Sequence, residues 1–170
     1  MDTLINNQEH IDLGTPEINK ITDNGAKIIV YHDLASVGSL QTLTQEYGAC
    51  IILYETKKNF GHWVCLIDQG DFFEFFDSYG FSPDQELKYA VYDNTPYLTR
   101  LIQNSKKPVR ANKVRLQSVV EDTNTCGRWA SVRVRMRHIP IQKFVSLFKN
   151  NKAYTPDFFV SAITFLTTFH

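Results

Sequence analysis

The chain has 170 residues, of which 43% are hydrophobic and 13% are aromatic. This composition supplies enough apolar side chains for one domain with a sizeable core, and it excludes a disordered chain. Eighteen lysines and arginines balance eighteen aspartates and glutamates. The net charge therefore does not favour a protein that binds nucleic acid or a membrane surface through its overall charge. We expect a single domain over residues 1–170.

Cysteine usage and hydropathy bear on the compartment. The three cysteines, Cys50, Cys65 and Cys126, include no CxxC pair, and the N-terminus does not resemble a secretory leader. We therefore expect a reducing compartment. The longest apolar stretch, Phe158 to Leu166, is much shorter than the roughly 20 residues that a membrane span requires. We expect a soluble protein that makes no membrane contact.

The first half of the chain predicts an arm followed by a sheet. Residues 1–25 are polar and contain several turn formers, so we expect an irregular N-terminal arm. Strands are expected at 27–31 and 49–54, and the second is apolar throughout, which favours the middle of a sheet. Two further strands are expected at 62–68 and 72–77, joined by a hairpin-like turn.

The order of these last two strands matters for the chemistry. The first residue of one antiparallel strand and the last residue of the next lie at the same edge of a sheet. His62 and Asp77 occupy these two places, so we expect them to face each other at about the spacing of neighbouring strands, roughly 5 Å. An imidazole and a carboxylate can interact at this spacing.

The second half of the chain predicts mainly helices. Ser82 and Gln85 form the pattern of a capping box, which predicts a helix over 82–92. A second helix is expected to begin near 94–96, and a last strand is expected over 114–119.

A longer helix is expected to begin at Cys126 and to pack along the sheet, because its apolar residues repeat at helical spacing. Two C-terminal helices are expected after Pro140 and at Pro156, since proline is favoured in the first turn of a helix.

Cys126 is the candidate nucleophile. The first turn of a helix presents unpaired N–H groups and the positive end of the helix dipole, which together stabilise a thiolate. The alternative is a buried, inert cysteine. Cys50 and Cys65 lie in the middle of expected strands and are less suited to this chemistry.

A thiol nucleophile needs a base, and the base needs an orienting group. His62 and Asp77 are the candidates for these roles, although a packing histidine and a turn-capping aspartate are the alternatives. An oxyanion also needs donors, and the Cys126 backbone N–H with the side-chain amide of Gln117 can supply them. Gln117 as a simple strand-end residue remains equally open.

Two other kinds of site were weighed. His62, Cys65 and Cys126 have no zinc-type spacing, so no metal is expected. A phosphate backbone can bind to basic side chains, although such residues usually form solvated faces. The basic residues considered for contact with DNA are Lys106, Lys107, Arg110, Lys113, Arg115, Arg128, Arg133, Arg135 and Arg137.

Taken in order, the histidine, acid, glutamine and cysteine resemble those of the adenovirus-type maturation proteases. This family has relatives among virophages, Polinton-type elements and large DNA viruses, and it is distantly related to SUMO proteases. The likeness extends from about Tyr31 to Met136. It lies in three motifs, which are Gly61-His62-Trp63, Phe76-Asp77-Ser78-Tyr79-Gly80-Phe81-Ser82, and Gln117-Ser118 followed by Thr125-Cys126-Gly127.

The resemblance implies a cysteine endopeptidase in which Cys126 is the nucleophile, His62 the general base, Asp77 its orienting carboxylate and Gln117 the oxyanion donor. It also implies an α+β fold, with a mixed sheet flanked by helices. One departure is that Gln117 lies further before Cys126 than the glutamine of the family does. The active-site loop is therefore longer here, or the oxyanion donor is another residue.

The resemblance further implies that the substrates are viral capsid and core precursor proteins, cleaved during virion maturation. The protein would then act in the virion and in the infected host cell, in the cytoplasm or a virus factory. No cofactor is required for the chemistry, but DNA or a viral peptide serves as an activator in adenovirus relatives. Two alternatives are a protease of ubiquitin-like proteins and an inactive structural or binding domain.

Overall fold

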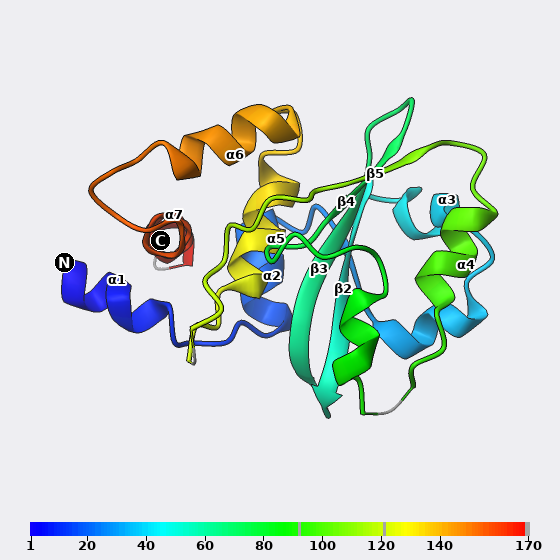
Figure 1. Ribbon diagram of the computed structural model, residues 1–170, viewed down its shortest axis with the longest axis horizontal. Helices are drawn as coiled ribbons and strands as arrows, with labels where there is room; N and C mark the ends of the chain where they lie inside the picture. The colour runs from blue at the N-terminus through cyan, green and yellow to red at the C-terminus, as the bar shows by residue number, and fades with distance from the viewer. Residues whose placement is uncertain (92, 121, 169–170) are drawn as a thin grey trace.

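The computed structural model describes residues 1–91, 93–120 and 122–168. Within them, five strands form one mixed sheet in the order β1-β2-β3-β4-β5 (Figure 1). The strands are β1 (Lys27–Val30), β2 (Ala49–Lys57), β3 (Phe60–Asp68), β4 (Phe73–Phe76) and β5 (Val109–Ala111). The strands β2, β3 and β4 are antiparallel neighbours, whereas β1 and β5 run parallel to β2 and β4. The predicted mixed sheet flanked by helices is confirmed.

Helices cover both faces of this sheet. One face carries α1 (Asp2–Gln8), α2 (Thr15–Thr22), α5 (Cys126–Arg135), α6 (Ile141–Lys149) and α7 (Pro156–Thr168), and the other carries η1 (Tyr31–Ser36), α3 (Leu40–Thr44) and α4 (Tyr97–Gln103) (Figure 1). The side chains of β2 alternate between the two layers: Ile51 packs with the α5 side, and Ile52 packs with the α3 and α4 side. Because β2 is buried on both faces, every position in its first six residues is buried.

The predicted irregular arm is wrong, because most of residues 1–25 fold into α1 and α2. Ile18 and Ile21 lie three residues apart on α2 and are buried in the core. This spacing places both on one face of a helix. The polar residues between them face outward, which is why the composition alone suggested a loop.

Two other predictions are also wrong. The last strand is β5, and not 114–119, where the N–H groups of Leu116 and Gln117 both donate to one acceptor, the carbonyl of Ser78. The helix expected over 82–92 is a short 3₁₀ helix, η2 (Gln85–Tyr89). Of the expected capping box, one bond forms, from the Ser82 N–H to Gln85 Oε1 at 3.0 Å. Residue 92 lies outside the described residues.

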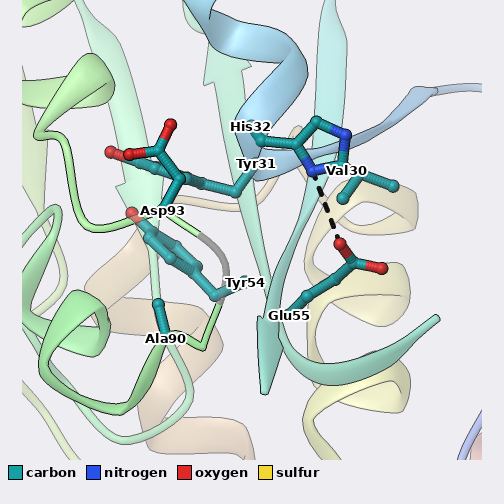
Figure 2. Close-up of a pocket in the computed structure, with 7 residues that line it drawn as sticks. All are labelled: Val30, Tyr31, His32, Tyr54, Glu55, Ala90 and Asp93. Carbon is teal, nitrogen blue, oxygen red and sulfur yellow. Dashed lines mark ion pairs between the residues drawn. The ribbon is translucent and has the colours of Figure 1, made fainter. Parts of the chain in front are cut away.

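A tyrosine pair fixes where η2 begins. The rings of Tyr31 and Tyr54 stack with their centroids 4.4 Å apart (Figure 2). Both hydroxyls donate to Asp84, which precedes η2 and has a left-handed backbone with φ of 65°. An aspartate tolerates this conformation better than most residues. The network therefore sets the position of Glu86, two residues further along.

The helices predicted at Cys126, after Pro140 and at Pro156 are confirmed as α5, α6 and α7, and the one expected near 94–96 begins at Tyr97. Among the described residues, no helix combines the length and the hydropathy that crossing a lipid bilayer requires.

Candidate active site

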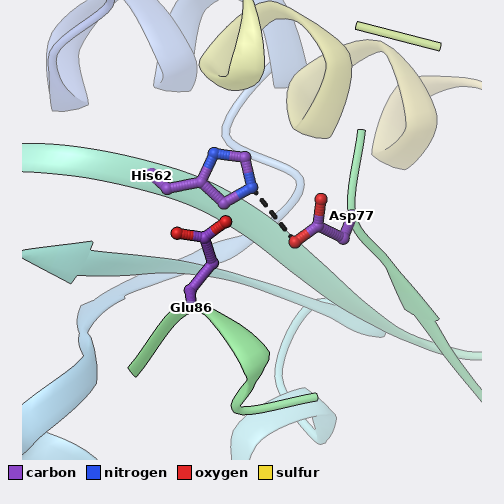
Figure 3. Close-up of side chains that lie close together, drawn as sticks. All are labelled: His62, Asp77 and Glu86. Carbon is purple, nitrogen blue, oxygen red and sulfur yellow. Dashed lines mark hydrogen bonds and ion pairs between the residues drawn. The ribbon is translucent and has the colours of Figure 1, made fainter. Parts of the chain in front are cut away.

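His62 and Asp77 meet at one end of the β3 and β4 pair. His62 Nε2 lies 3.1 Å from Asp77 Oδ2, and the two side chains are 8% and 1% exposed (Figure 3). The other carboxylate oxygen of Asp77 accepts the Tyr79 N–H at 2.7 Å. The carboxylate is thereby fixed from both sides. The meeting of His62 with Asp77 was predicted from the adjacency of the two strands, whereas the bond from Tyr79 was not.

The imidazole of His62 is also held by packing. The Tyr79 ring stacks on it with centroids 4.9 Å apart and an angle of 17° between the planes. Gly61, the residue before His62, lets the backbone of β3 lie close to β2. A Cβ on residue 61 would lie 1.9 Å from the Tyr54 carbonyl oxygen. Only glycine permits this approach. Tyr79 entered the sequence analysis only as part of a motif, and its contact with His62 was missed.

Cys126 opens α5 and is 7% exposed. Its Sγ lies 3.9 Å from the carbonyl oxygen of Gly61, the residue before His62, and Cys126 is near enough to His62 to raise the pKa of the imidazole. Since Nε2 is bound to Asp77, the imidazole nitrogen left for Cys126 is Nδ1, which points away from both carboxylates in Figure 3. The side chains of Cys126, His62 and Asp77 therefore lie together in one site.

The charge state of His62 follows from these contacts. Burial alone lowers the pKa of its imidazole, but the hydrogen bonds to Asp77 and Cys126, with their negative charges, outweigh burial. The pKa of His62 therefore lies well above its usual value. A raised pKa favours the imidazolium form, which is the partner that a thiolate needs.

Asp157, in the first turn of α7, organises the start of α5. Its buried carboxylate accepts hydrogen bonds from the Thr125 hydroxyl at 2.5 Å, the Trp129 indole N–H at 2.9 Å and the Ser118 N–H at 2.7 Å. These donors lie immediately before Cys126, within α5 and immediately after Gln117. Asp157 therefore joins the two segments that carry the candidate nucleophile and oxyanion donor. Sequence reasoning missed it.

The N-terminal segment forms a further support. The Asn124 backbone N–H donates to the Glu9 carbonyl at 2.7 Å, and the Trp63 indole donates to the Leu13 carbonyl at 3.1 Å. Gly127 makes room for this packing, because a Cβ there would lie 3.2 Å from both Leu13 and Trp63. The segment predicted as an arm is thus part of the wall that holds Cys126 against β3.

Gln117 lies in the same cleft as Cys126 and is almost fully buried. Its Oε1 accepts the Ser78 hydroxyl at 2.6 Å, and its Nε2 donates to the Thr123 carbonyl at 3.1 Å. These bonds fix the orientation of the amide. An amide nitrogen carries two hydrogens, so one remains for a further acceptor. Val119, on the longer loop, lines the cleft beside it.

A cleft of about 430 Å³ opens over these groups. Four aromatic rings, two carboxylates and the side chains of His62, Gln117 and Cys126 share its walls. The aromatic residues are Phe60, Tyr79, Phe81 and Tyr89, and the carboxylates are Asp12 and Glu86. A cleft of this size with apolar walls and a few polar groups suits a segment of extended peptide.

Two cleft residues, His62 and Glu86, belong with Asp77 to the one group of three side chains in the described part of the chain whose possible metal-ligand atoms converge. The ligand atoms of His62, Asp77 and Glu86 lie within 4.8 Å of one another. This set differs from the trio considered in the sequence analysis, because Cys65 is fully buried in the sheet.

The predicted basic contact surface for DNA is wrong at two positions. Arg128 is buried and binds Gln8 and Thr164, while Arg133 is buried and binds Glu74 with a 2.6 Å ion pair. Neither guanidinium can reach a phosphate. The other seven are at least partly accessible, and DNA contact through them stays a prediction. The exposed ones are Lys106, Arg110, Lys113, Arg115 and Arg135, and the partly exposed ones are Lys107 and Arg137.

Comparisons with known proteins give the following matches. A scan against family models finds no match. In structure, the chain is similar to the ASFV pS273R protease, with a TM-score of 0.47 and 15% identity, over 82% of this chain and 57% of that one. The chain thus spans little more than half the length of that protease.

In sequence, the chain is 35% identical over 167 residues to a protein of Sputnik virophage that is described as uncharacterized protein V9. The match covers 92% of this chain and 95% of that protein. Identity at this level over nearly the whole of both chains shows common descent. This chain belongs to the family of the Sputnik virophage protein V9.

Proposed function

We propose that this protein is a cysteine endopeptidase in which Cys126, His62 and Asp77 form the catalytic triad. The single observation that carries the proposal is the position of the buried His62 imidazole, which hydrogen-bonds Asp77 through Nε2 and lies near enough to Cys126 for that residue to raise the pKa of the imidazole. Asp77 fixes the tautomer with the proton on Nε2, so Nδ1 faces the thiol as the proton acceptor.

The reaction then follows from the charges. His62 takes the thiol proton through Nδ1, and the Cys126 thiolate attacks the scissile carbonyl carbon. The imidazolium returns the proton to the leaving amine, and the acyl-enzyme is hydrolysed by a water that His62 deprotonates. The Cys126 backbone N–H and the free hydrogen of Gln117 Nε2 would stabilise the oxyanion.

The substrates are viral capsid and core precursor proteins, and the reaction belongs to virion maturation. Kinship with a virophage protein supports a viral substrate. The protein would act in the virion and in the infected cell, and DNA or a viral peptide is a candidate activator. A ubiquitin-like protein with an extended C-terminus is the second candidate substrate, because a narrow cleft with aromatic walls also fits such a tail.

The test is cleavage of a peptide library, read by mass spectrometry, with and without added DNA. We expect cleavage by the wild type, none by Cys126→Ala, and wild-type cleavage by Cys50→Ala, which removes a buried cysteine outside the cleft. Cleavage by Cys126→Ala would remove the proposal. A ubiquitin-like reporter assayed in parallel separates the two substrate classes.

A further inference from the structure

Glu86 is a carboxylate without a partner in a place where a charge is costly. It is 7% exposed and lines the cleft, and within the described residues its carboxylate oxygens meet solvent there and not a hydrogen-bond donor or an ion-pair partner. Its carboxylate faces the His62 and Asp77 pair (Figure 3). Burial raises its pKa, Asp77 adds to the rise, and His62 and Lys88 oppose it. Buried carboxylates normally have a hydrogen-bond donor or a cation beside them.

The missing partner is defined by the atoms around it. One imidazole nitrogen and two carboxylates, converging within 4.8 Å, are ligands that zinc and similar divalent transition metals accept. In a tetrahedral zinc site these ligand atoms would lie about 3.3 Å apart. His62 Nε2 and Asp77 Oδ2 are 3.1 Å apart, which is close to this spacing, so the main adjustment is a movement of the Glu86 side chain towards them. The cleft supplies the entry path and room for a water as fourth ligand.

We propose that His62 Nε2, Asp77 and Glu86 bind one divalent transition metal ion of the zinc type, and that the bound ion switches off the thiol protease. The inhibitory half of this proposal rests on the function proposed above. The binding half does not, since it depends only on the three ligands.

Inhibition follows from the tautomer of His62. In the thiolate–imidazolium pair, the metal replaces the proton on Nε2, which is released to solvent, and the neutral imidazole keeps on Nδ1 the proton that it took from the Cys126 thiol. This N–H can still donate to the Cys126 thiolate, but Nδ1 cannot accept a further proton. The Nδ1 N–H is also a poor acid, because loss of its proton would leave a metal-bound imidazolate. Protonation of the leaving amine therefore stops, while the thiolate itself remains open to a small alkylating reagent.

The first experiment measures zinc binding to the full chain by titration calorimetry, with ZnCl₂ as the probe and a weak buffer that reports proton release. We expect one ion per chain and about one proton released. Glu86→Gln should weaken binding by more than about tenfold. Glu55→Gln is the matched control, since Glu55 also pairs with a histidine, and it should bind as the wild type does.

A second set of variants identifies the ligands. Cys126→Ala should keep wild-type affinity, because the sulfur faces the other nitrogen of His62. Glu86→Asp keeps the charge and should bind zinc better than Glu86→Gln, which separates ligation from a general loss of folding. No binding by the wild type, equal binding by Glu86→Gln, or a loss in Cys126→Ala as large as that in Glu86→Gln would each overturn the proposal.

The last measurement adds zinc to the active protein. We expect peptide cleavage to be lost while alkylation of Cys126 continues, and Glu86→Gln should need more than about tenfold more zinc for the same inhibition. Loss of both reactions together would mean that the metal binds the thiolate, which contradicts the assignment. If no peptide is cleaved even without zinc, the proposed function fails, while the calorimetric result for the site still stands.

Discussion

Among the histidines that the structure describes, His32 and His62 pair with carboxylates, and only one of them is placed to do chemistry. His62 and Asp77 lie 3.1 Å apart with side chains 8% and 1% exposed. His32 lies 3.3 Å from Asp33 and 3.4 Å from Glu55, but its side chain is 50% exposed (Figure 2). Exposed pairs of this kind contribute about 0–1 kcal/mol, because water screens their charges. The pairing of residue types is the same, so burial makes the difference.

The surroundings differ as well. The pocket beside His32 has a volume of about 10 Å³, which is scarcely the space of one water molecule, whereas the cleft over His62 has about 430 Å³. The two carboxylates at His32 also contact opposite ring nitrogens, so they cannot share a cation. At His62 one nitrogen faces the carboxylates and the other is free for the thiol. A histidine is a candidate base only when one ring nitrogen is bound by a carboxylate and the other faces a group that can give up a proton.

The largest expected effect comes from removing each imidazole in turn. His62→Gln should lower kcat/KM for peptide cleavage by roughly 10⁴-fold or more, since a triad acts as a unit. His32→Gln should leave it unchanged. Steady-state kinetics on one cleaved peptide checks both variants. An equal loss of kcat/KM in the two would contradict the conclusion that His62, and not His32, is the catalytic histidine.

The carboxylates should follow the same order with a smaller effect. Asp77→Asn keeps the shape but removes the charge that fixes the His62 tautomer, so kcat should fall by at least about 100-fold. Glu55→Gln should not change kcat. The measurement is kcat at saturating peptide, and wild-type kcat in Asp77→Asn would remove Asp77 from the triad.

A variant of Asp157 tests whether this carboxylate holds the start of α5, where Cys126 lies. Asp157→Asn leaves at least one of its three donors without an acceptor, so the free energy of unfolding should fall by about 1–3 kcal/mol. Asp33→Asn, at the exposed pair, should change it by less than about 0.5 kcal/mol. Urea denaturation measures the loss of unfolding free energy in both variants. Equal losses would contradict the claim that the buried Asp157 stabilises the fold more than the exposed Asp33 does.

The smallest effect is on the pH dependence of stability. The pKa of His62 is raised in the folded chain, so its proton stabilises the fold fully below the unfolded value of about 6.5 and this stabilisation is lost as pH rises through the folded pKa. The wild type should therefore lose more stability above neutral pH than His62→Gln does. Denaturation at several pH values measures the difference, and parallel curves would argue against a raised pKa.

Sequence reasoning reached the part of the site that local pattern encodes. Two strands joined by a short turn must place their far ends together, so the meeting of His62 and Asp77 followed from adjacency. The start of α5 at Cys126 followed from helical periodicity. Both are properties of short stretches of chain, which is why they could be predicted.

The rest depended on contacts between distant segments. Asp157 looks like the acidic residue that commonly opens a helix, and nothing near it in sequence indicates that Ser118 and Thr125 will bind it. Arg133 looks like a solvated charge until Glu74 is seen beside it. Glu86 is brought to His62 by the tyrosines that hold Asp84. No local pattern records these pairings.

The most direct test of a thiol activated by His62 needs no substrate. The rate of alkylation of each cysteine is measured against pH by peptide mass spectrometry, in the wild type and in His62→Ala. We predict that Cys126 alone reacts rapidly at and below neutral pH, and that His62→Ala removes this reactivity. Cys50 and Cys65 should stay slow, because both are buried and burial raises the pKa of the Cys50 thiol to about 12. A Cys126 whose rate below neutral pH is unchanged by His62→Ala would contradict the activated thiol and with it the proposed protease.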